Sequence, residues 1–232
     1  DCPKGKALLV SEDPFRDFNI INTHFTKLNN FKDELHDVEI GENSFVHRTV
    51  VIGNHVKIGK NCHIYPNVVI GDRTIIGDNV IIQSNTVIGG DAFYYRKLNG
   101  EFDRLISVGN VIVQNNVEIG NGCTIDRGVT DSTIIGEGSV LDNQIQIGHD
   151  TRIGKKCLIA SLVGIAGCCI IEDEVTIWGQ VGMASGLTIE KGTIILGQTG
   201  VNKSLKKGTY FGPLAQEFKE YLRNEVKLKK MK

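Results

Sequence analysis

The chain has 232 residues and a formal net charge of -1, which gives no global attraction for nucleic acid or an anionic membrane surface. No apolar stretch approaches the roughly 18 residues needed to span a membrane. With 27 glycines, only 4 prolines and 6% aromatic residues, the composition favours short β segments joined by tight turns over a helical bundle. The sequence starts at Asp1 rather than Met, so residues can be missing upstream.

Residues 1–36 form the first predicted segment. The apolar run from Lys6 to Val10 predicts a strand. Asp13 followed by Pro14 predicts a capped helix that continues to about Leu28. A strand and a helix alone are too small to fold, so we expect this segment to be the remnant of a larger α/β domain.

Residues 37–205 carry a six-residue repeat, which is the strongest signal in the sequence. An apolar residue recurs at every sixth position in three runs. These positions are Ile40, Val46, Ile52, Ile58, Ile64, Ile70, Ile76, Ile82 and Ile88; Val113, Ile119 and Ile125; and Ile135, Leu141, Ile147, Ile153, Ile159, Ile165, Ile171, Ile177, Met183, Ile189, Ile195 and Val201.

The repeat predicts a triangular parallel β-helix. Small or β-branched residues lie two positions before these apolar residues, and positions two apart share one face of a strand. Three such faces close one coil, so the chain predicts about eight coils, each buried against its neighbours. The glycine that often follows, such as Gly53 or Gly148, is expected to permit the sharp corner. Periodicity does not set the hand of the helix.

The repeat also explains most of the cysteines. Cys62, Cys123, Cys157 and Cys169 all lie two positions before a repeat residue, which predicts small, buried, apolar side chains. No CxxC pair or Cys/His cluster is present, so we predict no metal site and no disulfide framework. Free buried thiols suit a reducing cytoplasm.

The repeat is interrupted between about residues 89 and 110. This segment contains Asp91, Phe93 and further aromatic and cationic residues. A long loop in a tight solenoid usually serves function, so we expect it to cover a substrate or a neighbouring chain. The alternative is a loop that packs only on itself.

Residues 206–232 form the last predicted segment, a loop followed by a basic amphipathic helix from about Ala215 to Lys230. Its cations predict either attraction for an acidic partner such as acyl carrier protein or a solvated helix face. They are Lys206, Lys207, Lys219, Arg223, Lys227, Lys229 and Lys230.

His149 is the candidate catalytic residue, because the repeat places it at a coil corner two residues after Ile147. Gly167 lies one coil further at the same corner, about 4.8 Å away by strand spacing, and Ser185 lies one coil beyond that. Asn143 occupies the adjoining corner of the same coil. We expect His149 to remove a proton from an amine, and the Gly167 amide to stabilise the oxyanion that then forms.

The segment from Leu141 to His149 reads LDNQIQIGH. It closely resembles a motif of the UDP-3-O-acylglucosamine N-acyltransferase family of lipid A biosynthesis. Other segments resemble the same family in the same order: Ala7–Phe15, Gly90–Tyr94, Ile125–Gly128, Gly164–Gly167 and Tyr210–Pro213. The first of these resembles the end of the family's uridine-binding domain.

The resemblance implies an all-β, left-handed parallel β-helix that acts as an N-acyltransferase. It implies His149 as general base and Gly167 as oxyanion donor. The implied substrate-binding residues are Asp91 and Phe93 in the loop, Asp142 and Asn143 near the sugar or pantetheine, and Ser185, which stands where the family has a second histidine.

The resemblance also implies the partners. The acyl donor would be a 3-hydroxyacyl thioester on the phosphopantetheine of acyl carrier protein, with no resident cofactor. The acceptor would be the 2-amine of a UDP-3-O-acyl-glucosamine. A cytoplasmic homotrimer with active sites between subunits is implied as well.

Three alternatives stay open on the residues alone. One is another hexapeptide acyltransferase that acts on a different nucleotide amino sugar, for instance with acetyl-CoA. Another is a zinc enzyme of the carbonic anhydrase type, which needs three convergent histidines. The last is a non-catalytic scaffold or ice-binding helix, which regular outward threonine arrays would support.

Overall fold

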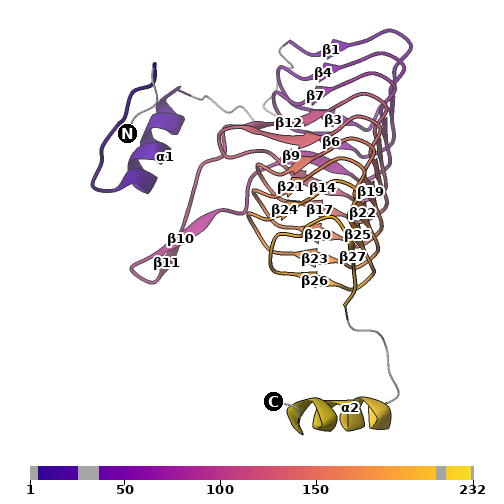
Figure 1. The fold of residues 1–232 in the computed structure, drawn as a ribbon. Coiled ribbons are helices and arrows are strands. Elements are labelled where there is room, and N and C mark those ends of the chain that lie inside the picture. Colours follow the sequence, from indigo (N-terminus) through magenta and orange to yellow (C-terminus); the bar gives the residue numbers. More distant parts are fainter. Residues whose placement is uncertain (1–4, 26–36, 213–217, 231–232) are drawn as a thin grey trace.

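A computed structural model describes residues 5–25, 37–212 and 218–230 of the chain. The dominant feature is a left-handed parallel β-helix built from three sheets of eight, nine and eight strands, which we name sheets A, B and C (Figure 1). Each coil contributes one short strand to each sheet. The predicted fold class is confirmed, and each sheet has eight or nine strands where the sequence predicts about eight coils.

The strands are mostly two residues long. Sheet A contains β1 (Glu39–Ile40), β4 (Lys57–Ile58), β7 (Ile75–Ile76), β12 (Asn110–Val113), β15 (Ser132–Ile135), β18 (Arg152–Ile153), β21 (Ile170–Ile171) and β24 (Thr188–Ile189). Sheet B contains β2 (Phe45–Val46), β5 (His63–Ile64), β8 (Ile81–Ile82), β13 (Glu118–Ile119), β16 (Val140–Leu141), β19 (Leu158–Ile159), β22 (Thr176–Ile177), β25 (Ile194–Ile195) and β27 (Thr209–Tyr210). Sheet C contains β3 (Val51–Ile52), β6 (Val69–Ile70), β9 (Val87–Gly90), β14 (Thr124–Asp126), β17 (Gln146–Ile147), β20 (Gly164–Ile165), β23 (Gly182–Met183) and β26 (Gly200–Val201).

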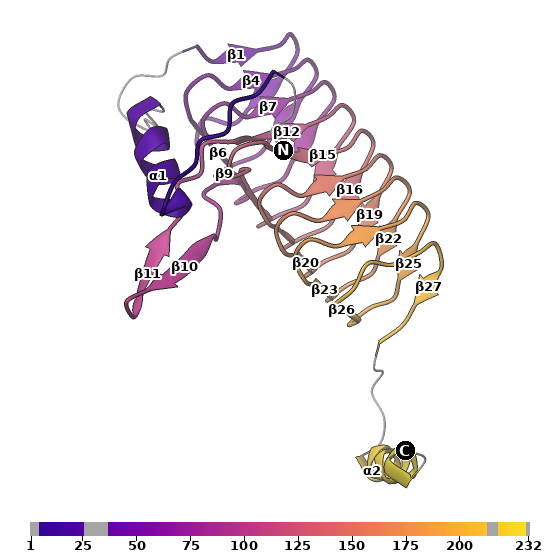
Figure 2. The same ribbon diagram turned by 60° about the vertical axis from the view of Figure 1, so that its left-hand side comes forward.

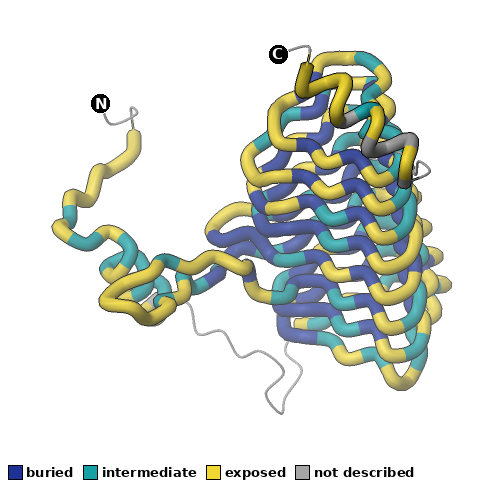
Figure 3. Tube along the Cα trace, turned by 90° about the horizontal axis from the view of Figure 1, so that it is seen from below, coloured by how far each residue is buried: buried dark blue, intermediate teal, exposed yellow. Residues whose placement is uncertain are grey.

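The repeat residues form the core. Ile58 pairs with Ile76 and Ile147 with Ile165, so identical repeat positions stack along the helix axis. These residues are buried from Ile58 to Val201, and buried residues (dark blue) recur along the coils in Figure 3. Burying an isoleucine contributes about 1.5–3 kcal/mol, so the interior stack stabilises the solenoid coil by coil.

The cysteines confirm this interpretation. Cys62, Cys123, Cys157 and Cys169 are buried and free, as predicted from their repeat positions. Cys168 is also free but exposed. Cys2 lies outside the described residues.

The corner glycines serve a different purpose from the one predicted. A Cβ on Gly53 would lie 2.4 Å from Asp72 Oδ1, and one on Gly148 would lie 2.5 Å from the Gly167 nitrogen. These glycines therefore permit close stacking of successive coils. The left-handed backbone of the corner lies two residues later, for example at Asn61 (φ 56°) and Asp150 (φ 57°), where Asn and Asp tolerate it best.

The segment before the solenoid differs partly from expectation. Asp13 caps α1 (Pro14–Phe25) as predicted, with its Oδ1 accepting the Arg16 amide at 3.1 Å; residues 26–28 of the predicted helix lie outside the described part. Residues Lys6 to Val10 form no strand, so that prediction is wrong. Leu8, Leu9 and Val10 are exposed, because no described strand lies beside them to pair with.

The interruption is an antiparallel hairpin, β10 (Tyr95–Leu98) and β11 (Glu101–Arg104), which projects from the solenoid beside α1 (Figure 2). It is therefore ordered structure rather than an irregular loop. Arg96 on β10 forms an ion pair with Asp13, with Nη2 and Oδ2 3.0 Å apart. This pair holds the pKa of Asp13 at about 2, chiefly through the Arg96 hydrogen bond.

At the C-terminal end, residues expected to be loop include β27, which extends sheet B by pairing with β25. The predicted basic helix is present as α2 (Phe218–Lys230), and residues 215–217 lie outside the described part. Within the described ranges, neither helix has the length and apolar character needed to cross a membrane.

Candidate active site

A pocket of about 680 Å³ opens on sheet C, at the corner where the chain turns toward sheet A. It contains four of the predicted site residues: His149, Gly167, Asp91 and Phe93. The remaining lining residues are Asp126, Gln146, Gly148, Gly164, Ile165, Ala166, Gly182 and Met183.

His149 is held in one orientation. The residue is only 8% exposed, and its Nδ1 lies 2.8 Å from Asp150 Oδ2. A carboxylate only accepts hydrogen bonds, so in the neutral ring Nδ1 carries the hydrogen and Nε2 keeps its lone pair. This tautomer is the one that a general base at Nε2 requires.

Asp150 was missed in the sequence, although it directly follows His149. Its side chain accepts the Val129 amide at 3.0 Å as well as the His149 hydrogen. Burial acts to raise the pKa of Asp150, but the hydrogen bonds from His149 and Val129 outweigh it, so the pKa is lowered. The group therefore stays ionised at neutral pH and stabilises an imidazolium beside it.

Gly167 lies directly against the imidazole. A Cβ at this position would lie 2.6 Å from His149 Nε2, so only glycine leaves room for the ring. At equivalent corners the amides of Asn54 and Lys155 donate to aspartate side chains at 2.8 Å. The Gly167 amide finds no acceptor in the described part of the chain. This amide could therefore donate to a bound ligand, and its role as oxyanion donor stays a prediction.

The hairpin segment supplies the outer wall of the pocket. Phe93 is 84% exposed. Asp91 lies near two cations, with Oδ1 3.7 Å from Arg127 Nε and Oδ2 3.8 Å from Arg104 Nη1. Arg127 is 2% exposed and donates to the Gly89 carbonyl at 2.8 Å, so it anchors the start of the interruption.

Tyr94 is a second residue that the sequence did not single out. Its ring lies edge-on to the His149 imidazole, with centroids 5.5 Å apart. On its other side, the Phe15 ring centroid lies 6.4 Å away, and Arg96 lies over the Phe15 ring. The N-terminal segment therefore contacts the candidate base through one intervening aromatic ring.

Asp126 is a third. Gln146 Nε2 donates to its Oδ2 at 3.0 Å, and burial raises the pKa of Asp126 while Gln146 and His149 oppose that shift. Asp126 belongs to the motif Ile125–Gly128 that carries the family resemblance, but the spacing of this motif in the sequence does not predict that it lies near His149.

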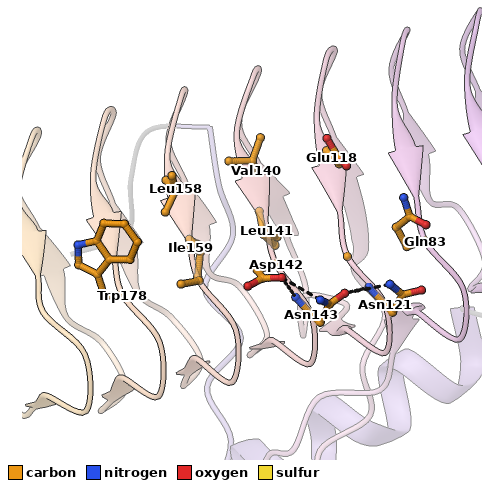
Figure 4. Close-up of a pocket in the computed structure, with 12 residues that line it drawn as sticks. Gln83, Glu118, Asn121, Val140, Leu141, Asp142, Asn143, Leu158, Ile159 and Trp178 are labelled. Carbon is orange, nitrogen blue, oxygen red and sulfur yellow. Dashed lines mark hydrogen bonds between the residues drawn. The ribbon is translucent and has the colours of Figure 1, made fainter.

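Asp142 and Asn143 lie elsewhere, in a pocket of about 520 Å³ on sheet B (Figure 4). Asn143 Nδ2 donates to Asp142 Oδ1 at 2.9 Å, and Asn143 Oδ1 accepts the Asn121 amide at 2.7 Å. Asn143 thus lies at the adjoining corner of the coil, as the repeat predicts, and in a single chain one six-residue face separates it from His149.

Ser185 occupies the predicted corner, one coil beyond Gly167, where the Gly186 amide donates to the Gly167 carbonyl at 3.0 Å. Its side chain is exposed and lies outside the set that lines the His149 pocket. Ser185 therefore does not line this pocket, and its role in substrate binding stays a prediction.

One group in the described part of the chain has the composition of a metal site. His149, Asp150 and Cys168 place their ligand atoms within 4.8 Å of one another, with Cys168 Sγ 3.9 Å from His149 Nδ1. The hydrogen bond to Asp150 already uses the ring nitrogen that faces this group. Burial and the nearby Asp150 charge raise the pKa of the Cys168 thiol, which disfavours the thiolate that metals bind.

Known proteins share both the repeat and the fold. Residues 55–90 match the bacterial transferase hexapeptide family model. A UDP-3-O-acylglucosamine N-acyltransferase from Methylobacterium sp. is 39% identical over 142 residues, covering 61% of this chain and 40% of that protein. A UDP-3-O-acylglucosamine N-acyltransferase from Campylobacter lari is 37% identical over 141 residues, covering 60% of this chain and 44% of that protein.

The chain is related in sequence to UDP-3-O-acylglucosamine N-acyltransferases. The resemblance seen in the motifs is thereby confirmed. The matched part spans less than half the length of these relatives. Among solved structures, the Francisella novicida UDP-N-acetylglucosamine acyltransferase superposes with a TM-score of 0.67 at 27% identity, covering 74% of this chain and 63% of that one.

Proposed function

We propose that the protein is an N-acyltransferase that moves a 3-hydroxyacyl group from acyl carrier protein to the 2-amine of a UDP-3-O-acyl-glucosamine. The observation that carries this proposal is the arrangement of Asp150, His149 and Gly167, which combines an oriented base with a free amide donor. The names of the sequence relatives supply the substrate class.

The residues suggest the following steps. The acceptor amine attacks the thioester carbonyl carbon while His149 Nε2 takes one N–H proton. A C–N bond forms, and the Gly167 amide donates a hydrogen bond to the oxyanion. The C–S bond then breaks, and the imidazolium returns the proton to the departing thiolate. Asp150 stabilises the imidazolium throughout, so no covalent enzyme intermediate and no resident cofactor are required.

We propose further that the working form is a cytoplasmic homotrimer. The pocket on sheet B presents Val140, Leu158 and the half-exposed Trp178 beside the polar Asp142 and Asn143. Placing this surface of one subunit against the sheet C pocket of its neighbour would bring Asn143 and His149 into one site. Such an arrangement would reunite the predicted residues that one chain keeps apart.

A second candidate is acylation of a different nucleotide amino sugar, either UDP-N-acetylglucosamine or an acceptor used with acetyl-CoA. The observation in its favour is the superposition with a UDP-N-acetylglucosamine acyltransferase. The same catalytic residues would serve this reaction, so the two candidates can be distinguished only by which substrates the protein uses.

The test is product formation by the natural full-length protein, followed by mass spectrometry. UDP-3-O-acyl-glucosamine and UDP-N-acetylglucosamine are each offered with a panel of 3-hydroxyacyl carrier proteins and with acetyl-CoA. We expect an amide only from the free-amine acceptor and a carrier-protein donor. Product only from UDP-N-acetylglucosamine, or only from acetyl-CoA, would replace this proposal with the second candidate.

A further inference from the structure

Asp126 breaks a pattern in sheet C. The position after the inward-facing repeat residue is glycine or alanine in neighbouring strands, as at Gly89, Gly148 and Ala166, but in β14 it is Asp126. The register against β9 shifts between Ile125 and Asp126, so that Asp126 pairs with Gly90. Bulges of this kind re-aim a side chain, and here the carboxyl group lines the His149 pocket.

In the described part of the chain, only one of the two carboxylate oxygens of Asp126 accepts a hydrogen bond. Gln146 Nε2 donates to Oδ2 at 3.0 Å, whereas Oδ1 accepts no hydrogen bond from the residues that the structure describes. Asp126 is half-buried in the wall, so its free oxygen has lost part of its water. A desolvated acceptor of this kind favours a ligand that brings a hydrogen-bond donor.

We propose that Asp126 selects an amine over a hydroxyl as the acyl acceptor by accepting the second N–H hydrogen of the attacking nitrogen. This inference rests on the proposed N-acyl transfer. In this arrangement His149 takes one hydrogen of the attacking nitrogen, and Asp126 accepts a hydrogen bond from the other.

The selection follows from counting hydrogens. A neutral amine has two N–H hydrogens and a lone pair, so it can give one proton to His149, donate the other hydrogen to Asp126 and attack with the lone pair. A hydroxyl has one hydrogen, which His149 must take. The hydroxyl oxygen would then face Asp126 Oδ1 with no donor between them. Sites built to bind an N–H group reject analogues that lack it, by up to about 10⁴- to 10⁵-fold.

The decisive variant is Asp126→Asn. Gln146 Nε2 can donate only to the new amide oxygen, so the amide nitrogen turns toward the pocket and presents a donor instead of an acceptor. We expect kcat/KM for UDP-3-O-acyl-glucosamine to fall about 10²-fold or more. With the matched 2-hydroxyl acceptor, UDP-3-O-acyl-glucose, kcat/KM should stay unchanged or rise.

The readout is the amine-to-hydroxyl ratio of kcat/KM, with Asp131→Asn as the matched control. Asp131 is exposed and pairs with Arg152 outside the pocket, so its variant should keep the wild-type ratio. If Asp126→Asn does not fold, Asp126→Ala replaces it, since Ala166 occupies the same position in β20. It should also shrink the ratio.

The outcomes separate the two proposals. A wild-type enzyme that forms no amide with any amine acceptor overturns both the proposed function and this inference. Amide formation by wild type, with a ratio that neither Asp126 variant changes by more than about threefold, overturns the role of Asp126 alone and leaves N-acyl transfer standing.

Discussion

At the scale of single residues, His149 is confined on three sides by contacts of different kinds. Asp150 fixes the hydrogen on Nδ1, Tyr94 meets the ring edge-on, and Gly167 lies against Nε2 with no side chain between. A base must hold its proton-accepting nitrogen within hydrogen-bond reach of the substrate, so loss of any contact is expected to lower the rate of the chemical step.

Gly167→Ala tests the closest of these contacts. The new Cβ would lie 2.6 Å from His149 Nε2, so the imidazole must move away from the reacting position. We expect kcat to fall about 10²-fold or more, as when an oxyanion donor is lost. The control is Gly200→Ala, whose Cβ meets nothing within 4 Å and which lies outside the pocket. Full activity in Gly167→Ala would contradict the assigned geometry.

Asp150 also makes stability depend on pH. Its pKa in the folded state is lowered, so the stabilisation is fully present above the unfolded value of about 3.9 and is lost as pH falls through the folded value. We therefore expect wild type to be more stable than Asp150→Asn at pH 7, with a difference that shrinks below about pH 4. Urea unfolding of both proteins at several pH values measures this difference in the free energy of unfolding. A difference that does not change with pH would refute the lowered pKa of Asp150.

Residue roles were only partly predictable from the sequence. The repeat placed His149 and Gly167 at one corner because stacking depends on a fixed period. Asp150 lies beside His149 in the chain, yet its direction depends on a left-handed backbone that the repeat alone did not reveal. Tyr94 and Asp126 reach the pocket through a hairpin and a bulge, which follow no period.

At the scale of elements, the β10–β11 hairpin links the N-terminal segment to the candidate site. Arg96 contacts Asp13 and the Phe15 ring, and Phe15 in turn lies beside Tyr94. Asn19 adds a second connection, accepting the Ile106 amide at 2.8 Å. We expect α1 and the hairpin to act together as one support for Tyr94.

Arg96→Ala should loosen that support. Because the ion pair with Asp13 is far from the solenoid core, we expect a several-fold fall in kcat with little change in the thermal unfolding of the β-helix. Lys97→Ala provides the control, since Lys97 is exposed on the same strand and forms no ion pair within the described chain. Equal activity of both variants would show that the N-terminal segment does not position Tyr94.

The elements themselves differed in how far the sequence revealed them. Each solenoid strand needs only its own inward-facing residue and a copy above and below, so the period was sufficient. The hairpin pairs residues of the interruption with each other, and its one sequence signal is the Asn99–Gly100 turn between the strands, which the period of the repeat does not mark. The expected strand from Lys6 to Val10 needs partners that the described chain does not contain.

At the scale of the whole molecule, the solenoid presents apolar side chains on its outer faces. Trp178 is 45% exposed and Leu158 38%, and both line the sheet B pocket that also contains Asn143. Such a patch is typical of a surface that another protein covers. It is the surface that the proposed trimer would bury.

Trp178→Lys tests this assembly. A charge in the middle of an apolar contact opposes association, so we expect a smaller mass in light scattering and a matching loss of activity. Ile170→Lys is the control, because Ile170 is 47% exposed on sheet A, away from both pockets. A Trp178→Lys protein with wild-type mass and activity would rule out this face as the subunit contact.

His149 is the proposed base for N-acyl transfer, and amide formation by wild type and His149→Ala tests that role most directly. Both proteins are given UDP-3-O-acyl-glucosamine and a 3-hydroxyacyl carrier protein under identical conditions. We predict an amide product from wild type and a rate about 10²- to 10⁴-fold lower from a folded His149→Ala. Equal rates would show that the proton leaves by another route and that this pocket is not the catalytic site.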